Sequence, residues 1–231
     1  MRAAVHDLAD SPIAAVVPVL NESGAIGVLL EALSRERVDE IVVVDGGSTD
    51  GTRERCVGAR VIAAPRGRGP QIAAGVGATK APILWILHAD CAPRGGSAQR
   101  IRDALADPKL ALGCFRLAFD EDHPLLHLYA LASRIDSPFT TFGDQGYFMR
   151  RADYVAAGGA PDWPLFEDVE LRRRLKRLGR VRKLDALLVT SARRFRSEGY
   201  ARQQLINGWL LLRFLAGADS VRLAAHYDRT R

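Results

Sequence analysis

Short apolar runs alternate with longer mixed segments through the first half of the chain. Four of these runs are rich in β-branched residues, which predicts buried strands over 13–19, 41–44, 61–63 and 83–87. The segments between them predict helices over 23–33, with Ser23 as the N-cap, from about residue 52, and over 71–79. Strands that alternate with helices form a mostly parallel sheet covered by helices on both faces, so we expect an α/β fold.

The second half loses this regular alternation. Its apolar pattern predicts further helices over 96–106, 124–135, from 152 and over 166–178, further strands over 112–119 and 187–190, and closing amphipathic helices over 201–215 and 219–226. No internal repeat or linker interrupts the pattern. We therefore expect one domain over residues 1–231, whose later part extends the sheet of the first half.

The amino-acid composition limits the kinds of ligand and structural site that we expect in this protein. The formal net charge is +6, mostly from arginine, whose planar guanidinium suits phosphate oxygens. Aromatic residues make up only 7% and no nucleic-acid-binding motif is present, so a small phosphorylated ligand fits better than a nucleic acid. The three cysteines are scattered, which predicts neither disulfides nor a zinc site and favours the cytoplasm. The longest apolar run, 205–217, is interrupted and too short to be a transmembrane segment.

Acids stand where two predicted strands end. Asp45 follows the 41–44 run and Asp90 follows the 83–87 run. Parallel strands end at one edge of the sheet, where open α/β folds bind ligands, so we expect both carboxylates at that edge. Asp90 beside a diphosphate could hold Mg²⁺ or Mn²⁺, with His88 as a second ligand or a hydrogen-bond donor. The alternative for each acid is capping of the turn that follows it.

Two further segments carry candidate chemistry. Glu167 and Asp168 open a predicted helix, where acids either satisfy free N–H groups or act as a general base towards an incoming hydroxyl. The segment Arg66-Gly67-Arg68 precedes another helix N-terminus, an arrangement that suits anions. The arginine cluster over 193–196 is either a second anion site or a solvated face.

The order of several motifs resembles that of a family-2 glycosyltransferase with the GT-A fold. The motifs are Pro18-Val19-Leu20-Asn21-Glu22, the 43–52 segment, His88-Ala89-Asp90 and Phe166-Glu167-Asp168. Segments 65–68, 143–145, 166–171 and 190–194 resemble a subgroup of short bacterial enzymes linked to arsenosugar and selenium metabolism, which includes the selenosugar synthases of selenoneine biosynthesis. The resemblance runs over nearly the whole chain and implies a nucleotide-binding half at about 11–110 and an acceptor half with the C-terminal helices at about 111–231.

The resemblance also implies roles for single residues. Asp45 would read the uracil of a UDP-sugar, Asp168 with its neighbour Glu167 would supply the base, and Asp90 would be the last acid of a metal-binding DXD motif. His88 replaces the first acid of that motif, which implies that arginines carry part of the diphosphate charge. The other implied nucleotide-binding residues are Pro18, Asn21, Glu22, Gly46, Gly47, Arg66, Arg68, Gln71, His88 and Ala89, and the implied diphosphate- or acceptor-binding residues are Asp144, Gln145, Arg193 and Arg194.

The expected reaction is inverting transfer of a sugar from a UDP-sugar, by this resemblance UDP-N-acetylglucosamine, to a small acceptor. Selenophosphate is the leading acceptor, because an anionic acceptor needs no base and suits the excess of arginine. Alternatives are a hydroxyl or lipid-linked acceptor, a sugar-1-phosphate nucleotidyltransferase, and a nucleotide-binding module without activity. The amphipathic segment over 209–214 either packs within the fold, forms a homodimer, or lies on a membrane surface.

Overall fold

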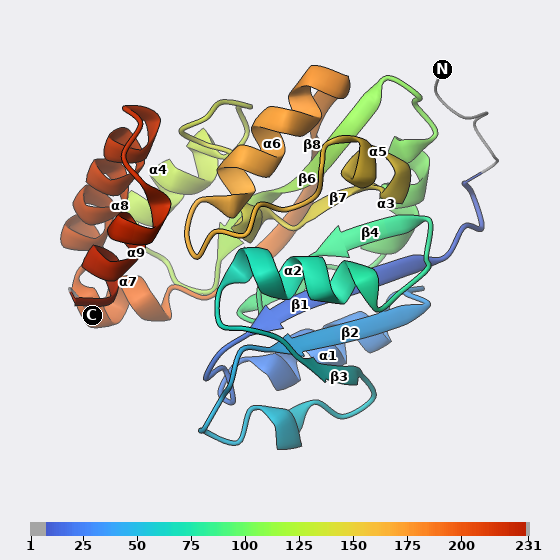
Figure 1. Ribbon diagram of the computed structural model, residues 1–231, viewed down its shortest axis with the longest axis horizontal. Coiled ribbons are helices and arrows are strands. Elements are labelled where there is room, and N and C mark those ends of the chain that lie inside the picture. Colours follow the sequence, from blue (N-terminus) through green and yellow to red (C-terminus); the bar gives the residue numbers. More distant parts are fainter. Residues whose placement is uncertain (1–7, 230–231) are drawn as a thin grey trace.

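One eight-stranded sheet runs through the computed structural model, which describes residues 8–229 except the side chains of Arg194 and of residues 227–229 (Figure 1). The strand order is β3-β2-β1-β4-β7-β6-β8-β5. The strands are β1 (Ile13–Val19), β2 (Glu40–Asp45), β3 (Arg60–Ala63), β4 (Ile83–Ile86), β5 (Cys91–Pro93), β6 (Leu110–Phe119), β7 (Tyr147–Arg150) and β8 (Arg180–Thr190).

Strands β1 to β4 are parallel, with β1 between β2 and β4 and β3 outside β2. Strand β7 is antiparallel to both β4 and β6, β6 is parallel to β8, and β5 is antiparallel to β8. The mostly parallel α/β sheet that the sequence predicts is thus confirmed. Because β2 and β4 flank β1 in the same direction, Asp45 and the Asp90 segment leave the sheet at one edge.

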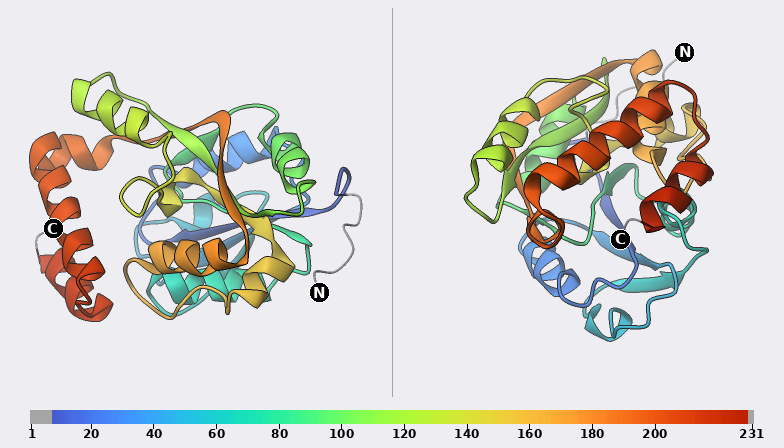
Figure 2. Two further views of the ribbon diagram at one scale, coloured as in Figure 1. Left: turned by 90° about the horizontal axis from the view of Figure 1, so that it is seen from above. Right: turned by 90° about the vertical axis from the view of Figure 1, so that its left-hand side faces the viewer.

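The helices cover both faces of the sheet (Figure 2). They are α1 (Ile26–Ser34), α2 (Arg68–Gly77), α3 (Ser97–Leu105), α4 (Pro124–Ala132), α5 (Arg151–Ala156), α6 (Glu167–Leu178), α7 (Arg193–Glu198), α8 (Tyr200–Leu215) and α9 (Ser220–Arg229), with short 3₁₀ turns η1 (Arg53–Arg55) and η2 (Gly143–Gln145). No helix in the described part of the chain is long and apolar enough to cross a membrane.

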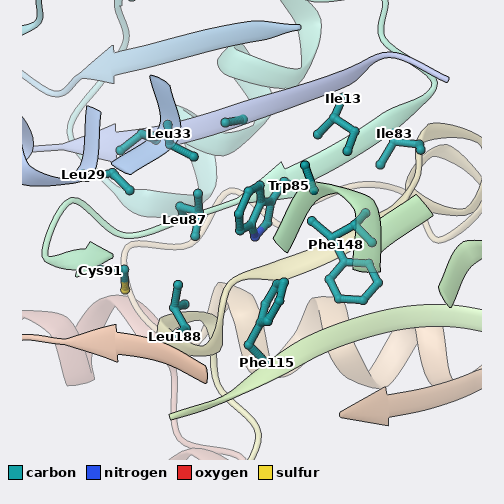
Figure 3. Packing of buried hydrophobic residues seen from close by; sticks show 14 of the residues in the cluster. Ile13, Leu29, Leu33, Ile83, Trp85, Leu87, Cys91, Phe115, Phe148 and Leu188 are labelled. Atoms are coloured by element: carbon teal, nitrogen blue, oxygen red, sulfur yellow. The ribbon is translucent and has the colours of Figure 1, made fainter. Parts of the chain in front are cut away.

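The period-two alternation of the strands separates two cores. On one face, side chains such as Ile13, Trp85 and Phe148 pack under α1 and α3, and the rings of Trp85 and Phe115 lie 5.6 Å apart (Figure 3). On the other face, Val16 and its neighbours pack under α2, α5 and α6. Helix α2 lies close to β1 because Gly75 has no side chain: a Cβ there would lie 2.4 Å from Val16 Cγ1.

A third, smaller cluster fixes the C-terminal helices to one end of the molecule. Leu210 of α8 and Leu223 of α9 pack against Leu165 in the loop before α6. The rings of Phe166 and Phe214 stack with centroids 4.8 Å apart. Figure 2 shows α4 and α8 at this same end. This end of the molecule therefore contains α4 together with the last helices of the chain.

Two local predictions are wrong. Helix α1 begins at Ile26 rather than at a Ser23 cap, because the Ser23 N–H donates to Asp50 Oδ2 and ties this residue to the neighbouring loop. The segment from Thr52 forms only the 3₁₀ turn η1, since Asp50 accepts hydrogen bonds from both the N–H and the hydroxyl of Thr52. The sequence also gave no indication of β5 or α7.

Candidate active site

Asp45 closes β2 inside the protein. Only 2% of it is exposed, its Oδ1 accepts the Ser48 N–H at 3.0 Å, and its Oδ2 lies 3.9 Å from Arg53 Nε. The backbone N–H of Gly46 donates to Val19 O, and Gly47 has a φ of 97°, a value that favours glycine. The capping role of Asp45 is therefore present in the structure, and its contact with uracil stays a prediction.

The loops after β1 and β2 are bonded to each other. Asn21 donates its N–H to Ser48 Oγ at 2.9 Å and accepts the Thr49 N–H on its Oδ1 at 2.9 Å. Its φ of 55° is unusual for a residue other than glycine. The Glu22 N–H donates to Thr52 Oγ1 at 2.8 Å. These bonds give the edge above β1 and β2 a fixed backbone shape.

Gln71 supports the same edge from below. Its Nε2 donates to Val19 O at 2.8 Å and to Val44 O at 2.7 Å, and its side chain is buried. A Cβ at Gly46 would lie 3.1 Å from this Nε2, so glycine at 46 leaves room for the amide. Gln71 thus joins the ends of two strands, and its contact with a nucleotide stays a prediction.

The C-terminal segment reaches this edge through one ion pair. Arg193, at the start of α7, places an Nη2 atom 2.8 Å from Glu22 Oε2. The pair joins residues 171 positions apart and brings the predicted diphosphate arginine to the predicted nucleoside loop. Arg194 also belongs to α7, and its side chain lies outside the described part of the structure.

A cavity of about 310 Å³ opens between the sheet edge and the C-terminal helices. Five of the predicted site residues line it: Arg68, His88, Asp90, Asp144 and Asp168. Aromatic and aliphatic side chains form much of its wall, from Phe119, Tyr129, Phe139, Phe142, Leu165, Phe166, Phe195, Leu210 and Leu211. A mostly apolar hollow with a few converging charged groups is the usual form of a small-molecule site.

Asp168 is fixed at the N-terminus of α6. Its Oδ2 accepts the Gly143 N–H at 2.6 Å, and its Oδ1 accepts the Val169 N–H at 2.9 Å. A Cβ at Gly143 would lie 3.2 Å from His88 Nε2 and 3.3 Å from Asp168 Oδ2. The carboxylate and the imidazole therefore approach one point from two sides, and glycine at 143 is what permits this approach.

The residue before α6 has a strained backbone. Phe166 has a φ of 62°, in the left-handed region that bulky residues rarely occupy. Such a conformation costs roughly 1–3 kcal/mol, and it is retained where the surroundings fix it. Here the stacked ring of Phe214 and the cluster around Leu165 hold the aromatic ring in the cavity wall. The same turn directs α6 so that Asp168 faces the cavity.

Asp144 keeps an unpaired oxygen in this wall. The Tyr129 hydroxyl donates to its Oδ2 at 3.3 Å, whereas its Oδ1 is buried and has no hydrogen-bond partner. Burial, together with the charges of Asp168 and Asp90, raises the pKa of Asp144 to about 7. The side chain can therefore exchange a proton near neutral pH and offers a hydrogen-bonding site to a ligand in the cavity.

Glu167 lies behind Arg68 and not in the cavity. Only 1% of it is exposed, and its Oε1 lies 3.1 Å from Arg68 Nε, in a geometry that makes no hydrogen bond. Burial and the neighbouring Asp168 raise the pKa of Glu167 to about 7, and Arg68 opposes this rise. Glu167 therefore holds the arginine that lines the cavity, while Asp168 is the acid that faces a ligand.

The donor set for a divalent metal is small. The described residues contain no group of three or more histidines, cysteines, aspartates and glutamates that could hold an ion. Asp90 and His88 together still fit Mg²⁺ or Mn²⁺, because such an ion keeps most of its shell as water and phosphate oxygens. The ion would then depend on the diphosphate of a bound ligand for most of its coordination.

The structure separates the predicted site residues into two groups. The cavity lacks Asp45 and the rest of the nucleotide edge, namely Pro18, Asn21, Glu22, Gly46, Gly47, Arg66, Gln71 and Ala89. Gln145 also lies apart, fully buried, where its amide donates to Thr140 O and accepts from Lys183 Nζ. It orders the turn that presents Gly143 and Asp144.

Sequence reasoning missed the aromatic wall. Tyr129 lies in the middle of α4, and Phe195 belongs to α7, so no motif marks them. The rings of Phe119 and Tyr129 lie 5.7 Å apart, and Phe195 packs edge-on against Phe119. The aromatic residues of the 137–144 loop were the available signal, since two of them, Phe139 and Phe142, line the cavity.

Solved structures of other proteins share this fold. A mannosyltransferase from Pyrobaculum calidifontis, solved in complex with GDP-Man and Mn²⁺, superposes with a TM-score of 0.62 at 20% identity. The match covers 79% of this chain and 58% of that one, so the chain spans less than two thirds of the mannosyltransferase. Glucosyl-3-phosphoglycerate synthase from Mycobacterium tuberculosis, in complex with Mn²⁺, UDP and glucosyl-3-phosphoglycerate, gives a TM-score of 0.64 at 21% identity, covering 95% of this chain and 88% of that one.

These likenesses show the GT-A type of fold. The comparison with curated proteins gave no match. Residues 14–158, more than half of the chain, match the sequence model described as glycosyl transferase family 2. This span holds the bonded loops after β1 and β2 as well as the Asp90 and Asp144 segments, and the protein is therefore a member of glycosyl transferase family 2.

Proposed function

We propose that this protein transfers a sugar from a UDP-sugar to a hydroxyl group of a small acceptor, with inversion at the anomeric carbon. The observation that carries the proposal is the placement of Asp168. Its carboxylate is held by the Gly143 N–H and lines the same cavity as Asp90. A carboxylate in hydrogen-bond reach of an acceptor hydroxyl acts as a general base.

The two groups of site residues would have different roles, one in binding the donor and the other in the transfer reaction. The bonded loops around Asp45 and Asn21 would hold the nucleoside, and Arg68 with the N-terminal segment of α7 would approach the diphosphate. A divalent ion at Asp90 would neutralise charge on the departing diphosphate. Asp168 would take the proton of the acceptor hydroxyl from the cavity side, and the aromatic wall would exclude water from the reacting atoms.

Two structural neighbours support a nucleotide-sugar donor. The mannosyltransferase was solved with GDP-Man, and the mycobacterial synthase was solved with UDP-glucose and phosphoglyceric acid. We infer UDP as the nucleotide here because the sequence resembles UDP-sugar enzymes around Asp45. The acceptor of the synthase is a small molecule, which matches the limited volume of the cavity in this chain.

Selenophosphate is the second candidate acceptor, with UDP-N-acetylglucosamine as donor and a selenosugar as product. The net charge of +6 and the resemblance to the selenosugar subgroup favour it. The lining of the cavity favours a hydroxyl instead, because three aspartates and one arginine are among its described residues. Carboxylates repel an anionic acceptor unless they are protonated, as Asp144 is in part near neutral pH.

A donor and acceptor screen tests the proposal. UDP release is measured for a panel of UDP-sugars, with and without EDTA, first alone and then with hydroxyl acceptors or with selenophosphate. We expect acceptor-dependent release and a product of inverted anomeric configuration by NMR. Release of UDP only with selenophosphate would mean that selenophosphate, and not a hydroxyl compound, is the acceptor. Binding of UDP-sugar without any cleavage would indicate a nucleotide-binding module without activity. A UDP-sugar product made from a sugar 1-phosphate would indicate a nucleotidyltransferase.

A further inference from the structure

Helix α4 is apolar on nearly every side but is largely exposed. Of its nine residues only Leu126 is buried, while 62% of Leu128 and 55% of Leu131 are accessible. The exposed apolar surface continues into the next turn through Ile135 and Phe139. A helix that is apolar all round is normally covered by protein or by lipid. Exposed apolar side chains that gather on one helix and the turn after it are typical of a binding surface.

Helix α8 carries a second apolar stripe. Leu205, Trp209 and Leu212 follow the i, i+4, i+7 spacing of one helix face, and 74% of Leu205 is exposed. The cavity is lined by other positions of the helix, among them Gln203 and Asn207, so the stripe faces away from the cavity. The Arg213 guanidinium lies over the Trp209 ring at 5.4 Å. Tryptophan beside arginine is typical of helices that lie in a membrane interface.

The two apolar surfaces belong to the same end of the molecule. Figure 2 shows α4 and α8 at that end in both views, and residues of both helices line the cavity. Tyr129 of α4 and Gln203 of α8 are among these lining residues. Anything that covers the exposed apolar residues therefore contacts two of the helices that line the cavity.

The charge of the C-terminal segment indicates whether a second copy of the chain or a lipid surface covers these residues. Residues 193–231 contain eight arginines and three acids and so carry +5 of the formal +6 of the whole chain. A second copy of this chain, docked by two-fold symmetry, would bring two such segments together, and like charges oppose that contact. An anionic lipid surface attracts the arginines and accepts the apolar side chains at the same time.

We propose that the exposed apolar residues of α4 and the apolar stripe of α8, together with the arginines of α8, bind the surface of an anionic lipid bilayer. Binding there places two of the helices that line the cavity at the lipid headgroups. The proposal rests on exposure and charge and does not depend on which sugar or acceptor the enzyme uses.

Vesicle sedimentation tests this inference with the full chain. Vesicles of phosphatidylcholine alone are compared with vesicles of equal parts phosphatidylcholine and phosphatidylserine. The test variant is Leu128→Gln/Leu212→Gln, at two exposed positions that do not line the cavity. The matched control is Val28→Gln/Val57→Gln, which removes two exposed apolar side chains from α1 and from the loop after η1. Thermal melting shows that all proteins are folded.

The wild type and the control are expected to sediment with the phosphatidylserine vesicles, and the test variant to lose about tenfold or more in vesicle affinity. Arg202→Gln/Arg213→Gln should weaken binding to these vesicles and remove most of its salt dependence. Equal binding by the test variant and the wild type would overturn the proposal, as would failure of the wild type to bind. A dimer in analytical ultracentrifugation that the test variant dissociates would assign the surface to a second copy instead.

Discussion

The predicted nucleotide edge and the cavity wall differ in how completely their polar groups are paired. At the edge, Asn21 and Asp50 each accept a backbone N–H of the neighbouring loop, and Asp45 accepts one from its own loop, so the polar atoms satisfy one another. In the cavity wall, Asp144 keeps a buried oxygen without a partner, and behind the wall both oxygens of Glu167 lack a hydrogen bond. Both regions also contain a residue other than glycine at positive φ, Asn21 in one and Phe166 in the other.

This difference separates a preformed region from a reactive one. A network of satisfied hydrogen bonds holds one shape and recognises a ligand that matches it. A buried carboxyl without a partner raises the energy of the ligand-free protein, and a ligand that supplies the missing partner lowers it again. We therefore expect substitutions at the edge to change binding of the donor, and substitutions in the cavity to change the rate of transfer.

The largest effect is expected from Asp168→Asn, which keeps the shape of the side chain and removes the base. Transfer to a hydroxyl acceptor should fall by about 10²–10⁴-fold in kcat, with little change in UDP affinity by calorimetry. Transfer to selenophosphate should change little, because that acceptor needs no base. A large loss with both acceptors would mean that Asp168 acts through the structure of the Gly143 turn.

Asp90→Ala should be nearly as severe. Loss of the carboxylate removes a group that would stabilise the departing diphosphate, so kcat should decrease by about 10²–10³-fold. Added Mg²⁺ or Mn²⁺ should no longer stimulate the variant, as measured by UDP release. Asp103→Ala, at an exposed position of α3, is the control. A decrease in kcat for Asp90→Ala as small as that for Asp103→Ala would mean that Asp90 only caps the turn before β5.

Gly143→Ala tests the close approach of His88 and Asp168. The new Cβ would lie 3.2 Å from His88 Nε2, so one of the two side chains must move. A shift of this kind should reduce kcat by about 10–10²-fold while the protein remains folded. Gly77→Ala is the matched control, because nothing lies within 4 Å of a Cβ at that position of α2. Full activity of Gly143→Ala would show that the cavity tolerates displacement of these groups.

The smallest effect concerns stability and pH. The ordinary pKa of an aspartate is 3.8, and that of Asp144 in the fold is about 7, so the folded state binds this proton more tightly than the unfolded state. The resulting stabilisation is complete below pH 3.8 and is lost as pH rises to about 7.

Between pH 3.8 and about 7, the melting temperature of Asp144→Asn should therefore fall by about half as much as that of the wild type. The other half remains because Glu167 titrates in the same direction. Asp122→Asn, at an exposed carboxyl, should leave the decrease as it is in the wild type. An unchanged pH dependence in Asp144→Asn would mean that other groups determine it.

The sequence was sufficient for the features that depend on local pattern. The β-branched runs predicted β1, β2, β3 and β4, and the rule that parallel strands end together placed Asp45 and Asp90 on one edge. The apolar pattern also predicted a helix that starts at residue 124, and α4 begins at Pro124, where the His123 ring accepts the Leu125 N–H.

The rest depends on contacts between distant segments. No local signal places Gly143 N–H on Asp168 or Arg193 on Glu22, because these bonds form only after β7, α6 and α7 have packed. The same is true of Gln71, whose amide joins two strand ends. The sequence pattern identified the charged residues of the predicted site. Their separation into an edge group and a cavity group depends on packing and could not be predicted.

Strand β5 has a consequence for how such a chain can evolve. It begins one residue after Asp90 and pairs with the end of β8, and the Ser191 N–H donates to the Asp90 carbonyl at 3.0 Å. The backbone of Asp90 is thus bonded to the segment that leads into α7, α8 and α9. A recombined chain with a different C-terminal segment must keep a strand that pairs with Cys91–Pro93, because otherwise the Asp90 segment loses this anchor.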